Sequence, residues 1–151
     1  MRPLSRRAAL GLGVAGAATG IFGFSGRARA DAKAAADQIA KFTGGKTAEK
    51  GKISIELPEI AENGNTVPLS IKVDSAVKAD DYVSEIRVVA DGNPFPGIVR
   101  FHLTPMAGRA EVSTRIRLNS TENVIVLAKT STGKLYMDRR MVKVTVGGCG
   151  G

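Results

Sequence analysis

Apolar and polar residues alternate along most of the chain after position 52, which is the period of a strand with one buried face. Clusters of Gly, Pro, Asn and Asp interrupt the alternation at steady intervals. The alternating runs cover residues 53–57, 67–73, 82–90, 98–104, 112–118, 123–129 and 134–146. Short strands at this spacing, without long helices between them, predict an all-β domain, an antiparallel β-sandwich. Pro68 predicts an edge position for the second strand, because proline donates no ladder hydrogen bond.

A short helix is expected before the strands, over Asp31–Thr43. Its alanines favour the helical conformation, and Ile39 and Phe42 lie three positions apart on one stripe. Gly44 and Gly45 follow directly and predict its end. Two turns of apolar stripe do not stabilise an isolated helix. We therefore expect the helix to pack against the domain or against a partner.

The first thirty residues have the three parts of an export signal, which are a basic head, an apolar stretch and a small-x-small site. The head contains the adjacent Arg6 and Arg7, which form a twin-arginine signature. The apolar stretch is too short and too rich in glycine for a membrane span. We expect cleavage after Ala30, so that the mature protein begins at Asp31 in the periplasm.

The formal charge of +8 comes mostly from this leader. The first thirty residues hold five arginines and no acid, which leaves 22 − 5 = 17 basic against 14 acidic residues, or about +3. The remainder shows no dense basic cluster with interleaved aromatic residues. These features exclude a nucleic-acid-binding surface of the usual kind.

The chain thus divides into a signal peptide at 1–30, a β-sandwich domain at 31–146 and a glycine-rich arm at 147–151. The arm holds Cys149, the only cysteine of the sequence, between two pairs of glycines. Those glycines are Gly147, Gly148, Gly150 and Gly151. A lone cysteine in an exported protein is a free thiol or bonds to another molecule. We expect a mobile arm that leaves the domain after Val146 and carries the thiol about 10 Å away.

No adjacent cation or helix end activates the thiol, so a carrier whose cysteine reacts inside a partner enzyme suits the sequence better than an enzyme. Three alternatives remain. His102, the only histidine, paired with Cys149 would indicate a cysteine hydrolase, although the alternation places His102 on an outer face. Met106, Met137, Met141, His102 and Cys149 together would make a soft-metal site for copper delivery. An assembly domain would use Cys149 for an intermolecular disulfide.

Several stretches have a distinctive sequence. The most specific is the terminal Val146-Gly147-Gly148-Cys149-Gly150-Gly151. The others are 60–64 with Val67-Pro68, 91–94, 101–105, 114–118 and 143–146. With the twin-arginine leader and the β-rich domain, these stretches resemble the SoxY family, the sulfur-carrier subunits of bacterial thiosulfate oxidation.

The resemblance implies an immunoglobulin-like β-sandwich and a covalent carrier that is not an enzyme and needs no cofactor. It implies that Cys149 accepts thiosulfate at the cytochrome complex SoxAX, that the hydrolase SoxB releases sulfate, and that the dehydrogenase SoxCD oxidises the remaining sulfur. It also implies a heterodimer with SoxZ, no membrane or nucleic-acid partner, and a disulfide-linked dimer through Cys149 as an inactive form.

Overall fold

The computed structural model describes residues 26–75 and 78–148, with side chains from residue 32 onward. Helix α2 (Gly26–Thr43) precedes strands β1 (Ile53–Glu56), β2 (Ile60–Asn63), β3 (Val67–Val73), β4 (Val83–Ala90), β5 (Gly97–His102), β6 (Glu111–Ile116), β7 (Glu122–Thr130) and β8 (Leu135–Val146). A short 3-10 helix, η1 (Pro105–Ala107), lies between β5 and β6. The leader predicted for 1–30, including Arg6 and Arg7, lies almost entirely outside the described residues.

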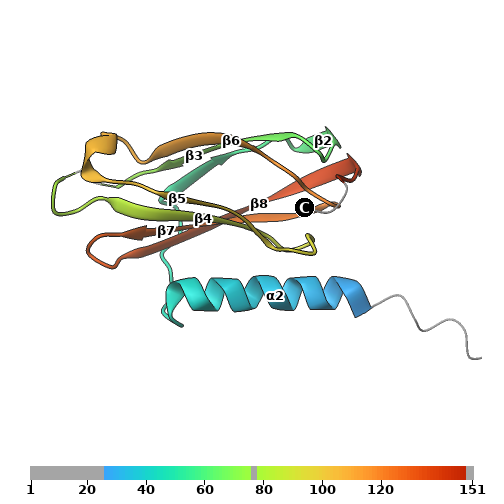
Figure 1. Ribbon diagram of the computed structural model, residues 1–151, viewed down its shortest axis with the longest axis horizontal. Coiled ribbons are helices and arrows are strands. Elements are labelled where there is room, and N and C mark those ends of the chain that lie inside the picture. Colours follow the sequence, from blue (N-terminus) through green and yellow to red (C-terminus); the bar gives the residue numbers. More distant parts are fainter. Residues whose placement is uncertain (1–25, 76–77, 149–151) are drawn as a thin grey trace, which may run out of the picture.

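The strands form two sheets that face each other (Figure 1). One sheet has the order β1-β3-β6 and the other has the order β2-β8-β7-β4-β5. Neighbouring strands are antiparallel except for β2 and β8, which are parallel. The predicted all-β sandwich is therefore confirmed, with one parallel pair at its edge.

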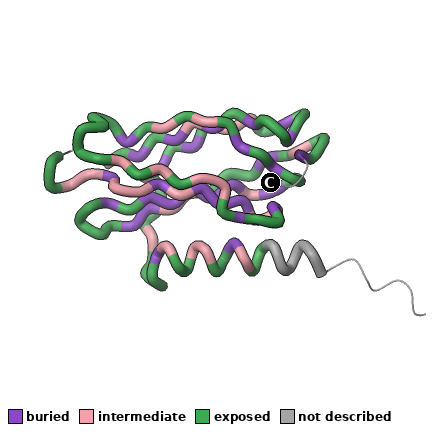
Figure 2. Tube along the Cα trace, in the orientation of Figure 1, coloured by how far each residue is buried: buried purple, intermediate pink, exposed green. Residues whose placement is uncertain are grey.

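The core lies between the two sheets, and the alternation in the sequence follows from it (Figure 2). Strand β3 shows the pattern most clearly, since Val67, Leu69, Ile71 and Val73 are buried against the opposite sheet. Val99 and Phe101 of β5 also pack against this core. Burial of such side chains is the main favourable term in folding.

Helix α2 covers the outer face of the five-stranded sheet (Figure 1). Ala35 is buried there with Val89, Ile125 and Leu127, and the predicted stripe residues Ile39 and Phe42 pack around them. This second layer explains why β4 and β7 are buried on both faces. The expectation that the helix packs on the domain is confirmed.

Helix α2 ends where the sequence predicts but begins earlier than predicted. The helix ends at Thr43, and Gly44 follows with a φ of 61°, a left-handed conformation that stops a helix. It begins at Gly26 rather than at Asp31, because the alanines and arginines before Asp31 also favour helix. The helix therefore runs through the predicted cleavage site, whose processing stays a prediction.

Two strand predictions are wrong. No strand was expected at residues 60–63, and residues 62–65 were expected as a turn, but residues 60–63 form β2, which has a single buried residue, Ala61, and no alternation to reveal it. Strand β3 was expected at an edge because of Pro68, but it lies in the middle of its sheet. Strand β1 ends opposite Ser70, so Pro68 has a neighbouring strand on one side only. A proline is compatible with that position.

Among the described residues, no helix is both long and apolar enough to cross a bilayer.

Candidate functional site

Four segments meet at the end of the sandwich from which the chain continues to Cys149 (right in Figure 1). They are the turn after β2, the β4–β5 loop, the β6–β7 loop and the residues after β8. The strand registers place them together, because Asn63 pairs with Val146, Val67 with Ile116 and Ala90 with Val124. We call this end the exit end. Cys149, Gly150 and Gly151 lie outside the described residues.

The chain is held at the exit end by backbone hydrogen bonds that join three of these segments. The Gly64 N–H donates to the Val146 carbonyl at 2.8 Å, and the Leu118 N–H donates to the Gly64 carbonyl at 2.8 Å. The Gly148 N–H then donates to the Leu118 carbonyl at 2.9 Å. Gly148 is buried. The expectation that the chain leaves the domain after Val146 is therefore wrong, since it stays bound as far as Gly148.

Three glycines at the exit end leave no room for a side chain. A Cβ on Gly147 would strike the Asn119 carbonyl oxygen, and a Cβ on Gly64 would strike that of Leu118. A Cβ on Gly148 would lie 2.9 Å from the Gly64 carbonyl oxygen. None of these glycines has a positive φ. They are needed here for close approach of backbones and not for an unusual backbone conformation.

The β6–β7 loop, which receives Gly148, is fixed by two buried polar side chains. The Asn93 amide donates to the Arg117 carbonyl at 2.9 Å and accepts from the Asn119 N–H at 2.8 Å. The Glu122 carboxylate accepts from the Gly92 N–H at 2.7 Å and from the Asn119 N–H at 3.0 Å. Each side chain thus ties the β4–β5 loop to the β6–β7 loop.

Glu122 is only 4% exposed. Burial raises the pKa of its carboxyl above the ordinary value, and the nearby charge of Asp91 acts in the same direction. The backbone N–H groups of Gly92, Ser120 and Asn119 oppose this rise in pKa because they bind the ionised form. The exit end therefore contains a carboxylate whose ionised form is disfavoured by burial, although both of its oxygens accept hydrogen bonds from backbone N–H groups.

The residues of the alternative sites are not brought together. His102 is exposed and lies at the end of β5 away from the exit end, as its pairing with Glu85 shows. Met137 and Met141 lie on β8, and β7 and β4 separate that strand from β5. Met106 lies in η1, beyond His102. The structure thus separates Met137 and Met141 from His102, and it places His102 away from the residue that precedes Cys149.

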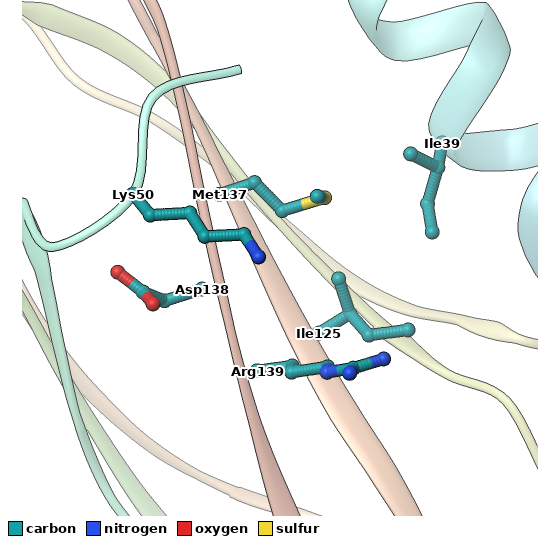
Figure 3. A pocket seen from close by; sticks show the side chains of 6 residues that line it. All are labelled: Ile39, Lys50, Ile125, Met137, Asp138 and Arg139. Carbon is teal, nitrogen blue, oxygen red and sulfur yellow. The ribbon is translucent and has the colours of Figure 1, made fainter. Parts of the chain in front are cut away.

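A pocket of about 240 Å³ lies between helix α2 and the five-stranded sheet (Figure 3). Its lining side chains are Ile39, Lys50, Ile125, Met137, Asp138 and Arg139. Met137 and Asp138 are ten residues or more from Gly148 along the extended strand β8, a span of about 30 Å. This pocket therefore does not form part of the exit end.

Sequence reasoning missed the residues that hold the chain before Cys149. Gly64, Gly92 and Asn93 were recognised only as turn residues, and Glu122 was not considered. One signal was available, because an acidic residue two positions before the apolar run 124–128 is unusual in a buried strand. The stretches at 60–64, 91–94, 114–118 and 143–146, which carry the resemblance, all reach the exit end.

Comparisons with known proteins agree with the resemblance seen in the sequence. The family model described as "Sulfur oxidation protein SoxY" matches residues 39–149. The sulfur carrier protein SoxY from Chlorobium limicola f thiosulfatophilum is 34% identical, with a TM-score of 0.62, over 76% of this chain and 99% of that one. No curated protein sequence matches significantly.

Two further solved structures share the fold. A superoxide reductase (neelaredoxin) from Ignicoccus hospitalis is 18% identical with a TM-score of 0.55, over 62% of this chain and 80% of that one. A putative superoxide reductase from Thermotoga maritima is 19% identical with a TM-score of 0.55, over 64% of this chain and 93% of that one. At these identities the likeness concerns the fold alone. The family match covers most of the chain and extends to the lone cysteine, and the chain therefore belongs to the SoxY family of sulfur carriers in sulfur oxidation.

Proposed function

We propose that this protein is a periplasmic carrier that holds the intermediates of thiosulfate oxidation covalently on Cys149 and presents them to partner enzymes. The observation that carries the proposal is the place of the cysteine. It is the only cysteine of the chain, it is the last residue matched by the family model, and it directly follows the glycine that closes the exit end.

The proposed cycle begins with thiosulfate bonding through its outer sulfur to Sγ of Cys149. The thiol proton is released, and two electrons pass to a c-type cytochrome complex, SoxAX. A hydrolase, SoxB, then adds water across the bond between the sulfane sulfur and the sulfonate, which releases sulfate and leaves a persulfide on Cys149. A sulfane dehydrogenase, SoxCD, oxidises that sulfur to a sulfonate with oxygen from water and takes up the electrons, and a second hydrolysis releases it as sulfate and returns the thiol.

In this proposal the chain supplies the attachment atom and the partners supply the catalysis. The described residues support this division, because the histidine and the methionines of the alternative sites are dispersed. A free thiol is a modest nucleophile, and activation inside a partner is one way to make it react. SoxZ is proposed as the stable partner, and the twin-arginine signature at Arg6 and Arg7 is proposed to direct export to the periplasm.

The test is the mass of the protein after incubation with thiosulfate, SoxZ and oxidised SoxAX. The proposal predicts an adduct of about 112 Da, which SoxB converts to one of about 32 Da. The Cys149→Ser variant, with an unchanged melting temperature, is expected to gain neither. A product that consists only of cross-linked dimer favours an assembly role instead, and a stoichiometric copper content in the purified protein favours metal delivery.

A further inference from the structure

The exit end contains a built seat for the two glycines before Cys149, which we call the clasp. It consists of Gly64, Asn93, Leu118, Asn119 and Glu122. We propose that Gly147 and Gly148 are a docked segment held by this clasp and that Asn93 positions the carrier cysteine through it. The role of Cys149 in this inference rests on the proposed function. The contacts of Gly147 and Gly148 are those of the described residues.

The first argument is that no side chain larger than that of glycine fits at Gly147 or Gly148. If Gly147 and Gly148 served only as flexible joints, their surroundings would be open. Instead a Cβ on either residue would meet backbone atoms of Asn119 or of Gly64. Backbone atoms cannot rotate away as the end of a side chain can. The surroundings therefore select glycine at both positions to allow close packing.

The second argument is that the hydrogen bonds form a continuous chain. Val146, Gly64, Leu118 and Gly148 are joined in that order by three bonds of 2.8, 2.8 and 2.9 Å. They connect the last strand of one sheet to the β6–β7 loop and to the turn that leads into the other sheet. Leu118 is fully buried in the core, so its carbonyl is a rigid acceptor for the Gly148 N–H.

The third argument is that the clasp has its own support. Asn93 is buried, and its amide both donates to the Arg117 carbonyl and accepts from the Asn119 N–H, on either side of Leu118. The two hydrogen bonds hold the loop in the shape that presents the Leu118 carbonyl. Asn93 is thus a positioning residue that acts on Cys149 through Leu118 and Gly148.

The clasp determines how far the thiol reaches. With Gly148 docked, the Cys149 Cα lies about 3.8 Å from a fixed point. With the clasp open, the fixed point moves back to Val146, and three extended residues give the cysteine about 10 Å of reach. The state of the clasp therefore decides how deeply Cys149 enters a partner's active site.

The test uses the full-length chain and two readouts that need no sulfur chemistry. Amide hydrogen exchange measures the protection of the Gly148 N–H. A nitroxide attached to Cys149 reports the mobility of residue 149. The clasp predicts that Gly148 exchanges at least about tenfold more slowly than Gly150. It also predicts that Asn93→Ala removes this protection and sharpens the nitroxide spectrum.

Thr130→Val is the control, because Thr130 is buried at the opposite end of the sandwich and its hydroxyl accepts from the Lys134 N–H. It is expected to lower the melting temperature without changing Gly148 exchange or nitroxide mobility. Equal exchange at Gly148 and Gly150 in the unmodified chain overturns the inference, as does an Asn93→Ala variant with unchanged Gly148 protection. Failure of Cys149 to take up thiosulfate, with Gly148 protected, contradicts the proposed function and leaves the clasp in place.

Discussion

The N–H of Gly148 donates a hydrogen bond of 2.9 Å to the carbonyl of Leu118, thirty positions earlier in the chain. Leu118 is fully buried between the two sheets. One bond thus links the hydrophobic core to the residue next to Cys149. The fold therefore holds the chain as far as Gly148, and the predictions below test this contact.

Substitution of Gly148 by valine is expected to destabilise the domain by about 1–3 kcal/mol, the usual cost of forcing extra atoms into a packed site. The branched Cβ would contact the Gly64 carbonyl and the Asn65 nitrogen. The mobile arm expected from the sequence would accept a valine here with no change in melting temperature, and the close contacts of Gly148 reverse that expectation. Chemical denaturation measures the change.

The matched control is Gly150→Val, on the far side of the cysteine. It is expected to leave the free energy of unfolding unchanged within about 0.5 kcal/mol. Both variants are expected to slow turnover in the reconstituted pathway, because bulk beside Cys149 obstructs entry into a partner. A Gly148→Val protein as stable as the unmodified chain contradicts the close packing at the exit end.

The pH dependence of stability is expected to contain a contribution from Glu122. Its pKa is raised in the folded protein, so the folded state binds this proton more tightly than the unfolded state. The contribution to stability is present below the unfolded-state pKa and is lost as the pH rises through the folded-state pKa. The unfolding free energy of the unmodified protein minus that of Glu122→Gln is therefore expected to fall as the pH rises above the ordinary pKa of a glutamate, about 4.3.

Urea denaturation at several pH values measures this difference. The comparison removes the contributions of the other carboxyl groups, which are common to both proteins. Asp91 is also kept in both, although its charge contributes to the raised pKa of Glu122. A difference that rises with pH contradicts the assignment.

The docking of helix α2 is tested by placing a charge on its buried face. Ala35→Glu puts a carboxylate against Val89, Ile125 and Leu127 and is expected to cost at least about 2 kcal/mol, or to detach the helix. Ala36→Glu is the control, because Ala36 is the next residue and is exposed. Limited proteolysis of the helix, with denaturation of the domain, distinguishes the two effects. Equal resistance of the two variants would show that the helix does not dock through Ala35.

The sequence predicted the parts of the fold that depend on periodicity. The alternation of Val67, Leu69, Ile71 and Val73 requires one buried face, and the structure confirms it. Strand β2 left no such signal, because it has one buried residue and is held by its parallel pairing with β8. Short strands fixed by distant partners are not visible in local patterns.

The terminal segment was predictable in composition but not in placement. A run of glycines is equally compatible with a flexible linker and with backbones in close contact. Only the positions of Gly64 and Asn119 decide between the two, and both are distant in sequence. For the same reason the roles of Asn93 and Glu122 became visible only when their loops were brought together.

The central claim is that Cys149 carries sulfur. The most direct measurement is the mass of the C-terminal peptide, isolated from cells grown on thiosulfate and compared with cells grown without it. The account predicts Cys149 adducts of about 112 Da and in steps of about 32 Da, which appear only with thiosulfate and are removed by a reducing agent. A peptide that carries an unmodified thiol in thiosulfate-oxidising cells, in every growth phase, would contradict the account.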